Sequence, residues 1–288
     1  MATLPPEGPN AEQIRYWNET AAPKWIEYQE VLDAQLEALG RLTMDRARLS
    51  PGEHVLDVGC GCGATTRALA VRVGANGSAH GIDLSAPMLA RAATLVREAG
   101  LRNVRFTNAD AQTHHFEPGS ADVLFSRFGV MFFADPPAAF GNLRGTLRAG
   151  GRLAFVCWQP LSENPWLLVP LGAAAQHIQL PPPPAPGAPG PFAFADPDRV
   201  RAILVEAGFE GIDFESVRDT LSVGGGGLED AVRILLEGVG PTSAAMREAD
   251  PAVRPRVYAA VREALTPFVT PAGLRLPAAA WIVTGQAP

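Results

Sequence analysis

Three glycines alternate with small residues directly after a short apolar segment, and this stretch carries the strongest chemical signal in the chain. Residues 55–58 read as a buried strand, Gly59, Gly61 and Gly63 follow it, and residues 64–73 read as a helix. Glycine adopts positive φ and lets a ligand approach the backbone closely. The start of a helix offers N–H groups that have no partner within the helix. Strand, glycine turn and helix start in this order predict a cradle for a nucleotide-like ligand.

The glycine spacing fits two classes of ligand. Gly59, Gly61 and Ala64 match the dinucleotide fingerprint with alanine in the last position. Gly59, Gly61 and Gly63 instead match the tighter loop that binds S-adenosylmethionine (SAM). Asp57 favours SAM, because a carboxylate at this point would repel a pyrophosphate but attract the ammonium and sulfonium groups of SAM.

Two further acidic residues follow the next strands, where a nucleotide site needs them. Residues 78–84 read as a strand containing Asp83, about twenty residues past the loop, where an acid accepts hydrogen bonds from both ribose hydroxyls. Ser85 is the better cap for the helix that follows, which leaves Asp83 for the ligand. A third strand, 104–108, runs towards Asp110, which we expect to accept from the amino group of adenine.

Residues outside these motifs complete the expected cofactor site. Trp17 and Trp25 either pack onto the sheet or form a lid with an aromatic face near the sulfonium, and we expect one of them to contact the cofactor. The backbone of Ala111 is placed to read the adenine edge, and Ser126 ends a fourth strand opposite the glycine loop. Besides the three acids and three glycines, the expected cofactor-binding residues are Trp17, Trp25, Cys60, Leu84, Met88, Ala111 and Ser126.

The elements that position these residues alternate between strands and helices. Residues 11–49, 132–147 and 196–207 read as helical, with Asp196 as the cap of the last helix. Strands are expected at 55–58, 78–84, 104–108, 122–127, 152–158, 212–223 and 280–284. This rhythm predicts βαβ units and a parallel, doubly wound α/β sheet. We divide the chain into a helical cover (1–50), a SAM-binding core (51–160), a proline-rich lid or linker (161–195), and a segment that completes the sheet (196–288) with a helical insertion at about 224–278.

Composition excludes several classes of function. The chain has 288 residues and a net charge of −6, which argues against a general nucleic-acid binder. No apolar run is long enough to cross a bilayer, and residues 1–10 lack the pattern of a secretion signal. Cys60, Cys62 and Cys157 suggest neither a disulfide framework nor a zinc site. We expect a cytoplasmic protein without a bound metal.

Taken together, residues 55–158 resemble class I SAM-dependent methyltransferases of the small-molecule type, a group that includes the ubiquinone and menaquinone biosynthesis enzymes. The matching stretches are 56–63 (LDVGCGCG), 81–85 (GIDLS), 108–111 (NADA) and 147–151 (LRAGG). The segment around Trp17, Asn18 and Trp25 also resembles the N-terminal cover of one bacterial subgroup. This resemblance implies a Rossmann-like, seven-stranded and mainly parallel sheet whose last strand is antiparallel.

The resemblance also implies a reaction. The cofactor is SAM, the acceptor is a small molecule, and catalysis depends mainly on bringing acceptor and sulfonium together. A general base is needed only if the acceptor must lose a proton. The candidates are His114 and His115, then His177, with Tyr258 and Glu237 behind them, while Arg127 could pair with an acidic acceptor.

Two other classes of function stay open. One is an NAD(P)-dependent oxidoreductase, although none of the three tyrosines has a lysine four residues later. The other is a SAM-binding regulatory protein without catalysis. The identity of the acceptor and the oligomeric state are left open by these residues, and a homodimer is compatible with them.

Overall fold

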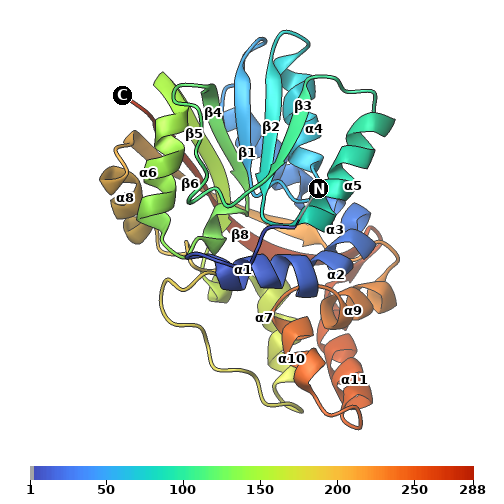
Figure 1. The fold of residues 1–288 in the computed structure, drawn as a ribbon. Helices are drawn as coiled ribbons and strands as arrows, with labels where there is room; N and C mark the ends of the chain where they lie inside the picture. The colour runs from blue at the N-terminus through green and yellow to red at the C-terminus, as the bar shows by residue number, and fades with distance from the viewer. Residues whose placement is uncertain (1–2) are drawn as a thin grey trace.

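A computed structural model describes residues 3–288 and shows a central sheet with helices on both faces (Figure 1). The sheet order is β3-β2-β1-β4-β5-β8-β6, and the short β7 pairs with β8 beside it. Neighbouring strands from β3 to β5 are parallel, whereas β8 is antiparallel to both β5 and β6. The strands are β1 (His54–Val58), β2 (Ser78–Asp83), β3 (Val104–Asn108), β4 (Ala121–Arg127), β5 (Leu147–Trp158), β6 (Glu210–Ser222), β7 (Val269–Thr270) and β8 (Gly273–Gln286).

The expected fold class is therefore confirmed. The strands are mainly parallel, and the last one lies antiparallel between two earlier strands. Residues 54–58 and 121–127 are apolar and buried along most of their length, as expected of parallel strands that are covered on both faces.

Each face of the sheet packs against its own set of helices. On one face, Val55, Val123 and Phe125 contact helix α4 (Ala64–Val73) and the end of α3 (Gln29–Arg46). On the other face, Leu124 and Phe155 belong to the large core that includes Phe140 and Leu143 of α6 (Pro136–Thr146). Helix α8 (Pro197–Glu206) packs beside α6, and α5 (Ala86–Glu98) packs against β3.

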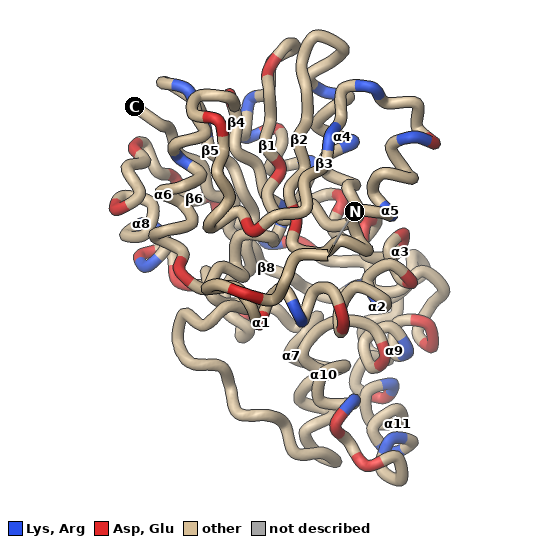
Figure 2. The backbone as a smooth tube through the Cα atoms, viewed as in Figure 1, with Lys and Arg blue, Asp and Glu red and all other residues tan. Residues whose placement is uncertain are grey.

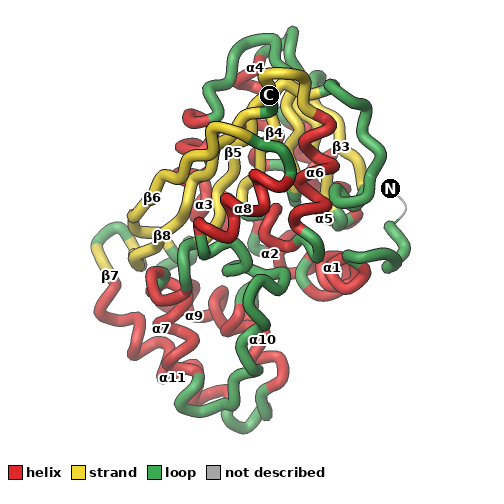
Figure 3. The backbone as a smooth tube through the Cα atoms, turned by 90° about the vertical axis from the view of Figure 1, so that its left-hand side faces the viewer, coloured by secondary structure: helices red, strands yellow, loops and turns green. Residues whose placement is uncertain are grey.

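The remaining helices gather beside the carboxyl ends of the parallel strands (Figures 1 and 3). The described part of the N-terminal cover contains α1 (Ala11–Arg15), a π-helical turn η1 (Tyr16–Thr20), α2 (Ala22–Glu27) and α3. A second group consists of α7 (Pro165–Ala174), which follows β5, and of α9 (Leu228–Glu237), α10 (Pro241–Glu248) and α11 (Arg254–Leu265), which lie between β6 and β8 in the sequence. Three single 3₁₀ turns complete the list: η2 (Val130–Phe132), η3 (Leu161–Glu163) and η4 (Thr266–Phe268).

The structure differs from the sequence expectation in several places, among them the start of β5 at Leu147 and the division of the N-terminal helix into α1, η1, α2 and α3. The helix expected over 132–147 begins only at Pro136, because Asp135 caps it through the Ala138 N–H. Helix α10 was not expected. Strand β8 begins at Gly273, well before the expected 280–284, so the helical part of the insertion ends with η4.

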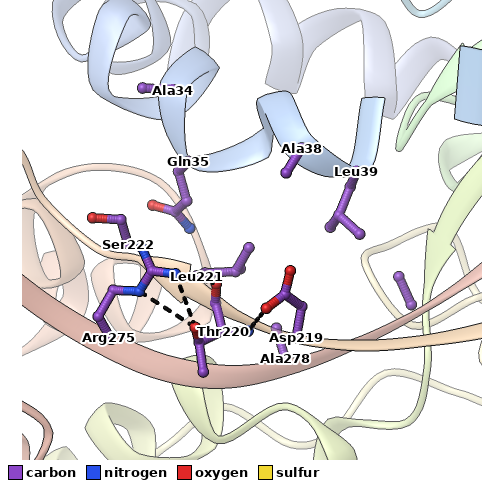
Figure 4. A pocket seen from close by; sticks show the side chains of 11 residues that line it. Ala34, Gln35, Ala38, Leu39, Asp219, Thr220, Leu221, Ser222, Arg275 and Ala278 are labelled. Atoms are coloured by element: carbon purple, nitrogen blue, oxygen red, sulfur yellow. Dashed lines mark hydrogen bonds between the residues drawn. The ribbon is translucent and has the colours of Figure 1, made fainter. Parts of the chain in front are cut away.

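Surface features of the described residues add little to the functional argument. Acidic and basic residues are interspersed over the sheet edges and helices (Figure 2). No helix within 3–288 is long and apolar enough to span a membrane. A cavity of about 120 Å³ lies between α3 and the paired β6 and β8, lined by Gln35, Asp219 and Arg275 among others (Figure 4). Its lining includes none of the expected cofactor residues.

Candidate cofactor site at the carboxyl edge of the sheet

The glycine loop connects β1 to α4 and depends on glycine at each of its three positions. Gly59, Gly61 and Gly63 all have positive φ, at 68°, 54° and 76°. A Cβ on Gly59 would lie 2.6 Å from the Cα of Gly129, and one on Gly61 would lie 2.9 Å from the Met88 methyl group. Any side chain here would be strained and would clash. The loop is therefore a close-packed cradle, as the spacing predicted.

Asp57 lies at the carboxyl end of β1, fully buried beneath this loop. Its Oδ2 accepts hydrogen bonds from the hydroxyls of Thr65 (2.7 Å) and Thr66 (2.6 Å) in the first turn of α4. Its Oδ1 is buried and has no hydrogen-bond partner. Burial raises the pKa of the Asp57 carboxyl to about 6, although both hydroxyls and the charge of Arg127 oppose this rise.

An orphaned, buried carboxylate oxygen is costly unless a ligand supplies its partner. Asp57 Oδ1 thus fits a cationic group bound beside the glycine loop. The ammonium of SAM has this charge, and the residues present are compatible with the cofactor expected from the sequence.

Asp83 ends β2 and holds the glycine loop in shape. Its Oδ2 accepts from the Gly61 N–H at 2.7 Å, and its Oδ1 accepts from the Ser85 N–H at 2.8 Å. Ser85 caps α5 as expected, with its hydroxyl accepting from the Met88 N–H. The capping role thus falls to Ser85, but Asp83 is not left free, because each of its oxygens already accepts a backbone N–H. Each oxygen keeps a second lone pair for a ribose hydroxyl.

Asp110 follows β3 and is held by the N-terminal segment. The amide of Asn10 donates to both carboxylate oxygens, at 3.0 and 2.9 Å, and the Gln112 N–H donates to Oδ1 at 2.9 Å. Asp57, Asp83 and Asp110 therefore end three adjacent strands, β1, β2 and β3, at one edge of the sheet. This edge is where open α/β sheets bind ligands.

The N-terminal cover packs directly onto the glycine loop. Trp17, Trp25 and Ile26 contact a cluster formed by Ala22, Cys62 and Met88. The rings of Trp17 and Trp25 meet edge to face at 5.8 Å. Both tryptophans therefore pack against the glycine loop. We had expected only one of the two to contact the cofactor, and that contact stays a prediction.

Two polar contacts fasten the cover to the core. Asn18 donates to the Leu84 carbonyl at 3.0 Å and accepts from the Ala86 N–H at 3.0 Å, which anchors η1 at the start of α5. Arg127, at the end of β4, pairs with Asp33 of α3 at 2.8 Å, and both side chains are largely buried. Arg127 therefore makes the ion pair at the sheet edge that was one of its two expected roles.

Several other expected residues use their polar groups within the protein. Ser126 donates to the Val58 carbonyl at 2.8 Å and accepts from the Gly129 N–H at 3.2 Å, joining the ends of β1 and β4. The buried Cys60 sulfur packs against Gly81, and burial raises the pKa of its thiol. The Ala111 carbonyl accepts from Asn142 at 3.0 Å.

The candidate general bases lie on three parts of the fold: the segment after Asp110, the residues just after α7, and the helices α9 and α11. His114 is half-buried with its ring against Phe116, and burial lowers the pKa of its imidazole. His115 and His177 are exposed. The Tyr258 hydroxyl donates to Glu237, and burial with this partner raises the pKa of Tyr258 to about 12, so it stays protonated at neutral pH.

Sequence reasoning missed three features of this edge. Asn10 gave no signal, because its partner Asp110 lies 100 residues away. The hydroxyls of Thr65 and Thr66 could have been found, since the first turn of a helix after a tight loop faces back towards the preceding strand end. Phe128 has a φ of 61°, which is rare for a bulky residue, and its ring stacks on Trp158 at 4.1 Å.

The sheet order and the helices on both faces give the described residues a fold of the α/β methyltransferase type. Residues 55–151 match the family model described as a methyltransferase domain. The described fold resembles a putative methyltransferase from Bacillus halodurans C-125, with a TM-score of 0.57, 19% identity, and coverage of 86% of this chain and 98% of the other. Residues 55–151 are thus similar to a methyltransferase domain, the class for which SAM is the cofactor expected from the sequence.

Two curated relatives support the same assignment. Aklanonic acid methyltransferase DauC from Streptomyces sp. (strain C5) is 38% identical over 117 residues, which are 41% of this chain and 53% of the relative. The ubiquinone/menaquinone biosynthesis C-methyltransferase UbiE from Ectopseudomonas mendocina (strain ymp) is 31% identical over 150 residues, 51% of this chain and 59% of the relative. The chain spans little more than half the length of these relatives. The resemblance to the ubiquinone/menaquinone type is confirmed for the shared domain.

Proposed function

We propose that the protein transfers a methyl group from SAM to a small-molecule acceptor. The observation that carries this proposal is the buried Asp57, whose Oδ1 lacks a partner directly beneath a positive-φ glycine cradle. When bound, SAM supplies the electrophilic methyl group. The chain supplies a carboxylate for the cationic end, and Asp83 and Asp110 for the hydroxyls and the base. The expected cofactor contacts of Trp17, Trp25, Leu84 and Met88 belong to the same proposal.

We infer an acceptor with a large flat or hydrophobic surface from an aromatic wall next to the cradle, in which Phe128 and Trp158 are buried and Trp166 is half-buried. Phe128 follows β4, beside the Gly129 that touches the glycine loop, and it stacks on Trp158 at the end of β5. Trp166 of α7 continues the wall, 5.1 Å from Trp158. Strained backbone at a bulky residue often marks a functional site. DauC and UbiE carry names that refer to aklanonic acid and to ubiquinone or menaquinone biosynthesis, which agrees with a wall of this kind.

The wall and the cover account for catalysis by positioning. Bringing acceptor and methyl donor into near-attack range supplies most of the rate enhancement in such a displacement, and closure of the cover excludes water. A base is required only if the acceptor must be deprotonated, and His114 and His115 remain the candidates from the sequence. We expect no nucleic-acid partner, given the net charge of −6, and a cytoplasmic location.

Isothermal titration calorimetry with SAM, S-adenosylhomocysteine and NAD tests the cofactor. We expect micromolar binding of the first two and none of NAD, and the reverse pattern would make the protein an oxidoreductase. Transfer of a labelled methyl group to phenolic, enolic and quinol acceptors tests catalysis. Tight SAM binding without turnover on these acceptors or on a metabolite extract would instead favour a regulatory SAM-binding protein.

A further inference from the structure

Asn10 makes contacts that its position in the chain does not explain. It directly precedes α1, where asparagine ordinarily caps the helix, yet its side chain makes no capping bond. Only 2% of its surface is exposed. Its Nδ2 instead donates to both oxygens of Asp110 and, at 3.0 Å, to Oε1 of Gln112, while its Oδ1 accepts from the Ala134 N–H at 2.8 Å.

This arrangement satisfies the buried amide completely. One N–H is shared by the two carboxylate oxygens, the other goes to Gln112, and the carbonyl oxygen is paired with backbone. The lost cap is offset by the bond to the carboxylate, because charge-assisted hydrogen bonds are about twice as strong as neutral ones. The segment before α1 is therefore fastened to Asp110, in addition to the anchors of the cover at Asn18 and Asp33.

The consequence for Asp110 is a fixed orientation. Its Oδ1 accepts from Asn10 and from the Gln112 N–H, whereas its Oδ2 accepts from Asn10 alone. The carboxylate cannot turn without breaking these bonds, and one lone pair of Oδ2 stays available.

We propose that Asn10 is a positioning residue for the cofactor: it holds Asp110 so that Oδ2 accepts from the 6-amino group of the adenine. This inference rests on the proposed function and extends the cofactor site to the N-terminal segment. Asn10 acts through Asp110 and makes recognition of the 6-amino group depend on closure of the cover. The opposite assignment, in which Asn10 occupies the place of the amino group and competes with it, predicts that Asn10→Ala binds S-adenosylhomocysteine more tightly than the wild type.

Calorimetry of Asn10→Ala with two ligands separates positioning from general loosening of the cover. The ligands are S-adenosylhomocysteine and its analogue whose purine lacks the 6-amino group. We expect the first to bind about tenfold more weakly than to the wild type, and the second to change less than about twofold. Arg15→Ala changes an exposed position on α1, the helix that follows Asn10; it is the control and should change neither affinity. Tighter binding of S-adenosylhomocysteine, or equal loss for both ligands, would overturn the inference.

A double-mutant cycle provides the second readout. Once Asp110→Ala has removed the carboxylate, adding Asn10→Ala should have no further effect on affinity, because interacting residues are not additive. An additive loss would show that Asn10 does not act through Asp110. If Asn10→Ala fails to fold, Gln112→Ala removes one partner of the same amide and should show a smaller loss with the same ligand selectivity. Wild-type protein that binds neither ligand refutes the proposed function itself, whereas binding without this selectivity refutes only the role of Asn10.

Discussion

Replacing Asp57 with asparagine should stabilise the ligand-free protein and weaken cofactor binding. Burial raises the pKa of this carboxyl from 3.8 to about 6. Each pKa unit corresponds to about 1.4 kcal/mol, so ionisation at neutral pH costs the folded state about 3 kcal/mol. Since the folded-state pKa lies above the unfolded one, the cost is absent below about pH 4 and develops as the pH rises towards 6.

The substitution removes this cost, which already includes the two threonine hydrogen bonds, because they lower the pKa. The amide nitrogen that replaces Oδ1 has no acceptor in the ligand-free protein, at a loss of about 2 kcal/mol. We therefore expect Asp57→Asn to raise the free energy of unfolding by about 1 kcal/mol at pH 7.5, with no gain at pH 4. Its affinity for S-adenosylhomocysteine should fall about 10- to 100-fold, because the cationic group loses its charged partner.

Urea unfolding at pH 4, 6 and 7.5, followed by calorimetry, measures both effects. Asp45→Asn is the matched control, since it makes the same chemical change at an exposed carboxylate paired with Arg72. This control should change stability by less than about 1 kcal/mol and leave cofactor affinity unchanged. A variant that is less stable at every pH and binds the ligand like the wild type would refute the reasoning and reduce Asp57 to a structural anchor for α4.

Three further substitutions test the rest of the edge. Asp83→Ala should weaken S-adenosylhomocysteine binding by about 1–3 kcal/mol in calorimetry, and unchanged affinity would remove the ribose role. Gly61→Val should abolish binding while circular dichroism still shows the fold, because the new side chain meets Met88 at a φ of 54°; retained binding would contradict the cradle. Asp33→Asn should leave Arg127 without its partner and expose the cover to limited proteolysis, which bound cofactor should slow; unchanged cleavage would show that this ion pair does not hold the cover.

Local chemistry made most of the fold predictable. The apolar segment before the glycine loop, the Ser85 cap of α5 and the Asp196 cap of α8 all involve residues within a few positions of each other. Such local interactions depend little on how the rest of the chain packs. The start of a helix was hard to predict where a 3₁₀ turn precedes it, because both have apolar residues at similar spacing. The turn η2 before α6 is an example.

The partners of the site residues were less predictable, because long-range packing decides them. The type and strand position of Asp110 suggested a ligand contact, but nothing nearby in sequence suggests that Asn10 would lie against it. Likewise, the bond between Asp83 and the Gly61 N–H needs the register of β1 against β2. Phe128, with its positive φ, directly precedes Gly129, which lies close to Gly59. This contact joins two loops that are far apart in the sequence, so residue spacing could not predict it.

The placement of β8 beside β6 has a consequence for how acceptor specificity can change. The chain leaves the sheet after Ser222 and returns at Arg275, and these two residues are paired neighbours. Everything between them, including α9, α10 and α11, is thus a module with adjacent entry and exit points. Exchanging that module for the equivalent one of a relative would leave the strand register and the three acids intact. Chimeras cut at this pair offer a direct route to new acceptors on an unchanged cofactor platform.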